Sequence, residues 1–464
     1  MSHTITNWDP EDVVAWEAGN KKIARRNLIW SVIAEHVGFS VWTIWSVMVL
    51  FMPESVYGFS ASDKFLLGAT ATLVGACLRI PYTLATATFG GRNWTVFSAF
   101  VLLIPTLGTM WLLANPGLPL WPYLLCAALA GFGGGNFASS MTNINAFYPQ
   151  RLKGWALGLN AGGGNIGVPM VQLVGLLVIA TAGNRAPYWV CAVYLVLLAV
   201  AGIGAALFMN NLEQHKIDFT AMKDILRVRD TWVIALLYIG TFGSFIGYSF
   251  AFGQVLQINF AAGGQSAAEA SLHAAQIAFI GPLLGSITRV YGGKLADRIG
   301  GGRVTLATFA GMLLSAGLLV GISTLDDHTT GPATALMMGG YVIGFIALFI
   351  LSGIGNGSVY KMIPSIFDAR SRSLPVSEAE RQYWSRAMSG ALIGFAGAIG
   401  ALGGVGINLA LRQSYLTSGS ATAAFCIFVA FYIFALGLTW VKYVRRPESA
   451  APVDVPAVTD MARA

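Results

Sequence analysis

The sequence predicts an all-α membrane protein with twelve transmembrane helices in two six-helix halves. Three observations predict this class: only 11% of the 464 residues are charged, the mean hydropathy is +0.65, and long apolar runs recur along the chain. Soluble domains carry about 25% charged residues, so this chain could not cover a soluble surface of its size. The composition therefore excludes an ordinary soluble enzyme, a disordered protein and a disulfide-rich secreted module.

The predicted helices are the apolar runs that are long enough to cross the bilayer. About 20 residues in a helix cross about 30 Å of hydrocarbon. The runs that meet this length are residues 29–52, 64–88, 95–115, 120–147, 154–180, 187–209, 231–255, 270–296, 303–325, 335–366, 386–412 and 421–442.

A polar stretch in the middle of the chain divides these helices into two sets of six. The expected organisation is an N-terminal segment (1–28), a six-helix bundle (29–209), a linker (210–230), a second six-helix bundle (231–442) and a tail (443–464). Lysine and arginine are concentrated on the side of both termini, which predicts that both termini are cytoplasmic. We expect a multi-pass protein of the bacterial cytoplasmic (inner) membrane, whose basic net charge reflects topology rather than nucleic-acid binding.

The sequence carries no sign of metal, cofactor or catalytic chemistry. HExxH, P-loop and GxSxG motifs are absent. The cysteines lie in apolar stretches without CxxC spacing and are predicted to be packing residues. They are Cys77, Cys126, Cys191 and Cys426. We expect no metal, no cofactor and no enzymatic activity.

Two arginines lie deep inside apolar segments at matching positions of the two halves. Arg79 ends the motif Gly-Ala-Cys-Leu-Arg, and Arg289, which lies 210 residues later, ends the motif Gly-Ser-Ile-Thr-Arg. Glycine-rich motifs around Asn136 and Asn356 repeat in a similar way. Internal repeats of this kind are typical of transporters, whose binding site lies near the middle of the membrane between the repeats.

The buried arginines predict an anion site. Each costs about 2.5–3.5 kcal/mol at the centre of a membrane helix. Lys361 is a third cation inside a predicted helix, whereas Glu35 is the one acid that lies clear of the helix ends. The core is therefore short of negative charge, and a guanidinium fork suits a flat oxyanion. Structural arginines that donate only to carbonyl groups are the alternative.

Two further patterns resemble a known family. Residues 293–300, which include Asp297 and Arg298, resemble the loop signature of the major facilitator superfamily, a loop that steers conformation. The glycine-rich segments 158–167 and 394–404 resemble the two nitrate-signature segments of the nitrate/nitrite porter family within that superfamily. The resemblance spans almost the whole chain and implies the major facilitator fold.

The resemblance also implies a substrate site. It implies that the guanidinium groups of Arg79 and Arg289 clamp the anion and that Phe137 and Phe242 lie against its faces. It also implies that Tyr238 adds a hydroxyl group and Asn165 an amide. The signature glycines let neighbouring helices approach and slide. They are Gly162, Gly163, Gly164, Gly167, Gly397, Gly400 and Gly403.

Titratable residues in the core predict proton coupling. Nitrate carries no proton itself, and its entry against an inside-negative potential costs about 2.3 kcal/mol per 100 mV. The candidate proton carriers are Glu35, His36 and Lys361. An ion pair between Glu35 and Lys361 is the structural alternative. We expect nitrate/H⁺ symport, with electroneutral nitrate/nitrite antiport as the alternative.

A nitrate-binding membrane sensor is a hypothesis of a different class. A sensor would be expected to carry a signalling domain, and the polar ends of this chain are short. The expected partners are nitrate, nitrite, protons and the lipid bilayer, without nucleic acid, and the chain is expected to be a monomer.

Overall fold

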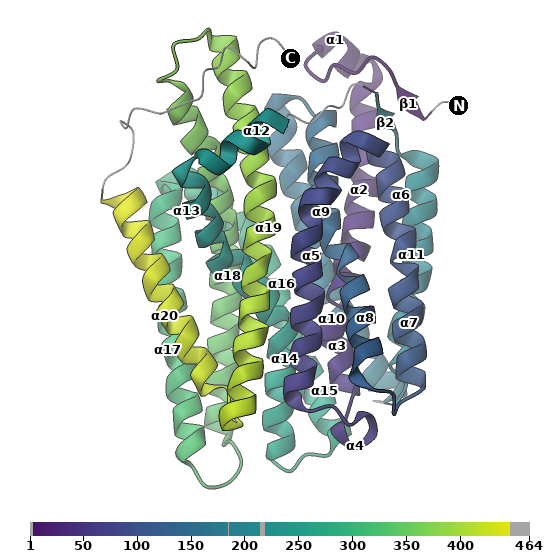
Figure 1. The fold of residues 1–464 in the computed structure, drawn as a ribbon, viewed down its shortest axis with the longest axis vertical. Helices are drawn as coiled ribbons and strands as arrows, with labels where there is room; N and C mark the ends of the chain where they lie inside the picture. Colours follow the sequence, from purple (N-terminus) through teal and green to yellow (C-terminus); the bar gives the residue numbers. More distant parts are fainter. Residues whose placement is uncertain (1–2, 184, 214–218, 446–464) are drawn as a thin grey trace.

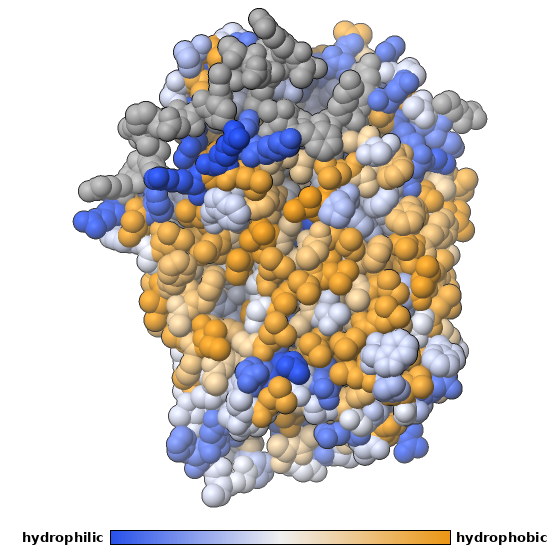
Figure 2. Space-filling view, in the orientation of Figure 1, coloured by the Kyte–Doolittle hydropathy of each residue, from blue (hydrophilic) through white to orange (hydrophobic). Residues whose placement is uncertain are grey.

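The computed structural model describes residues 3–183, 185–213 and 219–445. Within these residues, twelve helices are long and apolar enough to cross a membrane, which confirms the predicted fold class. The helices run along the long axis of the molecule (Figure 1). Hydrophobic residues cover the middle of the visible face and hydrophilic residues gather towards both ends (Figure 2). The chain is a multi-pass membrane protein.

The N-terminal half contains the first six crossings. They are formed by α2 (Lys21–Trp42) with α3 (Trp45–Met48) and the 3-10 helix η2 (Val49–Phe51), α5 (Ala61–Phe89), α6 (Gly91–Val101) with α7 (Leu103–Ala114), α8 (Leu120–Ala130) with α9 (Phe132–Phe147), α10 (Gln150–Ala182), and α11 (Tyr188–Phe208). The short helix α4 (Glu54–Tyr57) follows the first crossing.

The C-terminal half contains the other six crossings. They are formed by α13 (Arg229–Tyr238) with the π-helix η4 (Ile239–Gly243) and α14 (Ser244–Ala262), α15 (Ala267–Ala278) with α16 (Ile280–Ile299), α17 (Gly301–His328), α18 (Ala335–Ser371), α19 (Glu378–Ser418), and α20 (Thr422–Thr439) with the π-helix η5 (Trp440–Val444).

The expected N-terminal segment and linker fold against each other. Strand β1 (Thr4–Ile5) pairs in parallel with β2 (Asn211–Leu212). The remaining short elements are α1 (Val13–Ala15), the π-helix η1 (Trp16–Asn20), α12 (Phe219–Asp224) and the 3-10 helix η3 (Ile225–Arg227). Helix α2 begins at Lys21, earlier than the apolar run predicts, because its first turns are polar. Residues 446–464 of the expected tail lie outside the described residues.

The duplicated arginine motifs end at equivalent turns. Gly90 and Gly300 each lie eleven residues after an arginine of the pair and adopt positive φ values of 87° and 92°. Glycine adopts this conformation without strain. Asp297 and Arg298 lie in α16, which continues to Ile299. The expected loop position of these two residues was therefore wrong, because the helix runs on until the turn at Gly300.

The two halves meet along their inner helices and are tied together at one end. Helix α5 packs against α19, and α10 packs against α16. We call the end that carries β1 and α12 the terminal end, and the end that carries α4 the distal end (Figure 1). At the distal end, the backbone carbonyl of Leu50 accepts hydrogen bonds from Gln257 Nε2 (2.8 Å) and Ser271 Oγ (2.6 Å). These bonds cross between the halves.

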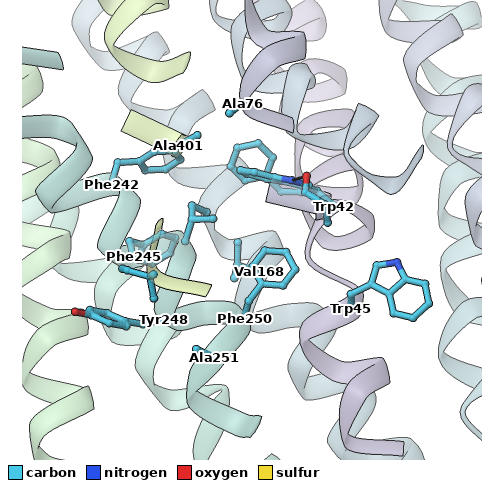
Figure 3. Close-up of a cluster of buried hydrophobic side chains, with 14 of the residues drawn as sticks. Trp42, Trp45, Ala76, Val168, Phe242, Phe245, Tyr248, Phe250, Ala251 and Ala401 are labelled. Atoms are coloured by element: carbon cyan, nitrogen blue, oxygen red, sulfur yellow. Dashed lines mark hydrogen bonds between the residues drawn. The ribbon is translucent and has the colours of Figure 1, made fainter. Parts of the chain in front are cut away.

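One hydrophobic core runs through both halves. It includes Trp42 and Val168 of the N-terminal half and Phe242 and Phe245 of the C-terminal half. Figure 3 shows Trp42 and Phe242 on opposite sides of this central region. The polar groups of the site lie within this apolar and aromatic surrounding.

Candidate anion site between the two halves

Arg79 on α5 lies at the interface of the halves and is 1% exposed. Its Nη1 donates to the backbone carbonyl of Gly397 on α19 at 2.8 Å. Its Nε and Nη2 have no hydrogen-bond partner among the described residues. Arg79 therefore makes one bond across the interface and keeps other N–H groups for a further acceptor.

Arg289 on α16 approaches the same region from the C-terminal half and is 8% exposed. Its Nη2 lies 3.4 Å from the hydroxyl oxygen of Tyr238 on α13. Its Nη1 has no partner in the part of the chain that the structure describes. The two arginines that the sequence predicts to act together are thus both buried, and each has N–H groups to donate.

Aromatic rings surround both guanidinium groups. Arg79 Cζ lies 4.8 Å from the ring centres of both Phe137 and Phe242. Arg289 Cζ lies 6.0 Å from the ring centre of Phe137. Tyr238 stacks on Phe242 at 5.2 Å with an interplanar angle of 6°. These cation–π contacts hold the arginines in place, and the predicted aromatic residues do come together around them.

Tyr360 on α18 is a further member of this cluster that sequence reasoning missed. Its ring centre lies 5.3 Å from Arg289 Cζ and 4.6 Å from the ring of Tyr238. Its hydroxyl donates to the backbone carbonyl of Ile393 at 3.2 Å. Tyr360 precedes the charged Lys361 in the sequence, and no motif marks its ring as part of a site.

Two buried amides near the arginines have no partner for their side chains among the described residues. Asn165 on α10 and Asn356 on α18 are 0% exposed, and both side-chain polar atoms of each are unpaired. The backbone carbonyl of Asn165 accepts a bond from Ser286, which lies one turn before Arg289 on α16. Buried polar groups without partners are rare and costly, which is consistent with a ligand site.

The arginines have no carboxylate partner among the residues that the structure describes. No ion pair in the described ranges includes Arg79 or Arg289. Glu35 on α2 is 1% exposed and interacts with both arginines electrostatically, without an ion pair. Its Oε2 accepts a bond from Asn160 Nδ2 at 2.8 Å, and its Oε1 is unpaired. The site therefore keeps an excess of positive charge.

The other predicted proton carriers lie in different surroundings. His36 Nδ1 lies 3.1 Å from the backbone carbonyl of Gly163, so this histidine bonds to the backbone of α10. Lys361 Nζ pairs with Asp297 Oδ1 at 2.9 Å, and both side chains are about half exposed, at 48% and 52%. The expected buried position of Lys361, and its alternative pair with Glu35, were therefore wrong. Its place in a long apolar helix gave no sign of this half-exposed pairing with Asp297 on α16.

The signature glycines of α10 make room for α2. A Cβ atom at Gly163 would collide with Val32, and one at Gly164 would collide with Glu35. A Cβ atom at Gly167 would collide with the backbone carbonyl of His36. Gly162 differs, because nothing lies within 4 Å of its added Cβ. The expected close approach is thus present at three of these positions and absent at Gly162.

The signature glycines of α19 make room for the aromatic cluster and for Arg79. A Cβ atom at Gly400 would collide with the Tyr238 ring, and one at Gly403 would collide with the backbone of η4. A Cβ atom at Gly397 would lie 3.1 Å from Arg79 Nη1 and 3.2 Å from the Tyr360 hydroxyl oxygen. These glycines let α19 approach the site closely.

Comparison with known proteins agrees with this arrangement. The sequence profile of the Major Facilitator Superfamily matches residues 36–398. The nitrate/nitrite transporter NarU of Salmonella typhimurium is 36% identical over 96% of this chain and 97% of its own length. The probable nitrate/nitrite antiporter NarK2 of Thermus thermophilus is 33% identical over 95% of this chain and 97% of its own.

Solved structures show the same fold at low identity. A D-xylose-proton symporter superposes with a TM-score of 0.66 at 15% identity, over 92% of this chain and 99% of its own. The nucleoside transporter NupG gives a TM-score of 0.60 at 12% identity, over 89% of this chain and 98% of its own. The profile match and the relatives together show that the chain belongs to the major facilitator superfamily and, within it, to the nitrate/nitrite porter family.

Proposed function

We propose that this chain transports nitrate across the membrane by alternating access. The observation that carries the proposal is the pair of buried arginines, one from each half, which have unpaired N–H groups and no carboxylate partner among the described residues. Two guanidinium forks between aromatic faces suit a small, flat, weakly hydrated oxyanion. The relatives named as nitrate/nitrite transporters support nitrate as this anion.

Nitrate binding would favour closure of the halves around the site. Without an anion, Arg79 and Arg289 repel each other across the interface. An anion that bonds to both removes this repulsion and links α5 to α16. A ligand shifts a conformational equilibrium only through its different affinity for the two states, and this bridge supplies that difference. Phe137, Phe242, Tyr238 and Asn165 would complete the binding site.

We assign uptake with protons as the transport mode, with Glu35 as the proton carrier. Glu35 is buried beside the site and has one unpaired carboxylate oxygen. Protonation of Glu35 would remove its charge while nitrate binds. We also place the terminal end in the cytoplasm of a bacterial cell, because its basic residues fit the positive-inside rule.

Nitrate/nitrite exchange is the second candidate. The Thermus thermophilus relative is named a probable antiporter. The half-exposed pairing of Lys361 with Asp297 also supports exchange, because it favours a structural role for this lysine over proton transfer. Exchange of two monovalent anions is electroneutral and needs no proton.

Transport by purified protein in liposomes tests these modes. We expect labelled nitrate to accumulate when the outside is acidic and the inside contains no nitrite. Glu35→Gln should abolish this accumulation while nitrate binding persists. Uptake that depends strictly on internal nitrite would replace symport with exchange, and nitrate binding without any transport would favour a sensor.

A further inference from the structure

A buried polar network joins three helices of the N-terminal half around Glu35. Asn160 Nδ2 on α10 lies 2.8 Å from Glu35 Oε2 and 2.5 Å from Ser140 Oγ on α9. Ser140 Oγ lies 2.9 Å from Ser31 Oγ on α2. All of these side chains are at most 6% exposed. An amide nitrogen carries two hydrogens, so Asn160 can donate to both neighbours at once.

The spacing of these residues along their helices creates the network. Ser31 and Glu35 lie four residues apart on α2, so they share a face, and Asn160 and Gly164 do the same on α10. Glu35 therefore faces Asn160 with one oxygen and Gly164 with the other. The missing side chain of Gly164 provides the space for Oε1, because a Cβ atom there would collide with it.

The charged and titratable groups near Glu35 come from several helices. Arg79 on α5 and Arg289 on α16 act on the carboxylate electrostatically. His36, the next residue on α2, directs its Nδ1 to the backbone carbonyl of Gly163. Ser140 and Asn160 are the uncharged polar groups on α9 and α10. Ser140 and Asn160 both act on the Glu35 carboxylate as hydrogen-bonding side chains, and Asn160 makes the direct 2.8 Å bond to Oε2.

We propose that Asn160 is a positioning residue that holds Glu35 for proton exchange, with Gly164 leaving room for the free oxygen. This inference rests on the proposed proton-coupled transport. Asn160 fixes Oε2, so the proton binds at Oε1: an O–H bond forms there and neutralises the carboxylate, and the same bond breaks when the proton leaves. Without Asn160, the carboxyl group loses the donor that fixes the orientation of Oε2.

Substitutions of Asn160 test this role. Asn160→Asp keeps the shape of the side chain and replaces the donor by an acceptor, and Asn160→Ala removes the polar group. In liposomes, we expect the pH of half-maximal proton-driven nitrate uptake to rise by about one unit in both variants, because the charged carboxylate has lost a stabilising donor. Nitrate counterflow at equal pH on both sides should stay within about twofold of the unchanged protein, since counterflow needs no net proton movement.

Asn143→Ala is the matched control. Asn143 lies on α9 in the same half and is 4% exposed, and its Nδ2 is unpaired among the described residues. Asn143→Ala should leave the pH dependence of proton-driven nitrate uptake unchanged. A second test leaves the amide in place: Gly164→Ala should displace Oε1 and also change the pH profile, whereas Gly317→Ala on α17, where nothing lies within 4 Å, should not.

The outcomes separate this inference from the proposed function. If Glu35→Gln retains proton-driven uptake, the proposed coupling itself fails. If Glu35→Gln abolishes it while the Asn160 variants keep the original pH profile, only the positioning role is overturned. Folded Asn160 variants that lose counterflow as strongly as proton-driven uptake would also overturn it, because the residue would then be structural.

Discussion

Arg79 and Arg289 occupy matching positions in the sequence, but their hydrogen bonds differ. Arg79 donates to a carbonyl of the other half, at Gly397, whereas Arg289 contacts the hydroxyl of Tyr238 in its own half. Arg79 therefore helps to join the halves in addition to its proposed role in anion binding. Both keep N–H groups that have no partner within the described residues, and such buried groups gain most from a charged acceptor.

Replacement of either arginine by lysine should weaken nitrate binding. Lysine keeps the charge but loses the planar fork. We expect Arg79→Lys and Arg289→Lys each to lower nitrate affinity about 10- to 100-fold, the effect of losing a charge-assisted hydrogen bond, as measured by calorimetry. The exposed Arg372, directly after the end of α18, bonds to Asp368 one turn earlier, so Arg372→Lys is the control. Unchanged affinity in both site variants would contradict a clamp.

The sequence could predict the arginines but not all of their neighbours. Arg79 and Arg289 stand out because an unpaired cation in an apolar helix is costly wherever the helix points. Asn160 and Tyr360 do not stand out, because whether they reach the site depends on which face of the helix carries them. The same uncertainty misplaced Lys361, whose half-exposed side chain pairs with Asp297 on α16.

The exposed ion pair between Lys361 and Asp297 leads to a second prediction. Exposed pairs contribute about 0–1 kcal/mol to stability, and this pair lies apart from the buried carboxylate. We expect Lys361→Ala to leave the pH profile of nitrate uptake unchanged and to lower the unfolding free energy by less than about 1 kcal/mol. A pH profile altered as strongly as by Glu35→Gln would restore Lys361 as a proton carrier.

Helices α10 and α19 each show a change in packing along one face. Asn165 on α10 contacts α16, and Gly397 on α19 contacts α5. Nearer the terminal end, the same faces carry Gly158 and Gly394, and nothing lies within 4 Å of a Cβ added at either position. These faces of α10 and α19 thus contact the other half at the site and are open at Gly158 and Gly394.

A large side chain on this face of α19 should prevent closure of the terminal end. We expect Gly394→Leu to bind nitrate normally but to lower uptake at least about tenfold, because the added side chain blocks the approach of α5 that alternating access requires. Gly406→Leu is the control, since Gly406 lies on the same helix, is exposed, and has nothing within 4 Å of its added Cβ. Normal uptake by the Gly394 variant would mean that this face stays apart throughout the cycle.

The positions of the helices could be predicted from the sequence, but their irregularities could not. Apolar runs show where the chain crosses the membrane, whatever it packs against. The break between α2 and α3 at Thr43–Ile44 and the π-helix Ile239–Gly243 depend on packing between distant segments. The π-helix carries Phe242 towards Arg79, and π-helical turns are frequent at functional sites.

At the scale of the whole molecule, the repeat organises the site. Each half contributes one arginine and one phenylalanine, so the proposed anion site needs both halves. The distal end is held closed by hydrogen bonds between the halves, including those from Gln257 and Ser271 to the Leu50 carbonyl. Opening of the distal end, which the proposed alternating access requires, would break these bonds.

Loss of both hydrogen-bond donors to the Leu50 carbonyl should favour the conformation in which the distal end is open. Each bond contributes about 0.5–1.5 kcal/mol, so the double variant Gln257→Ala/Ser271→Ala should favour distal opening by about 5- to 150-fold. Spin labels at the exposed distal positions Trp121 and Leu336, in a protein whose native cysteines are replaced, report the distance between the halves. We expect a larger fraction of long distances between the two spin labels in the double variant. Nitrate should reduce this fraction, because it would bridge the two arginines. An unchanged distance distribution would show that the distal contacts do not control opening.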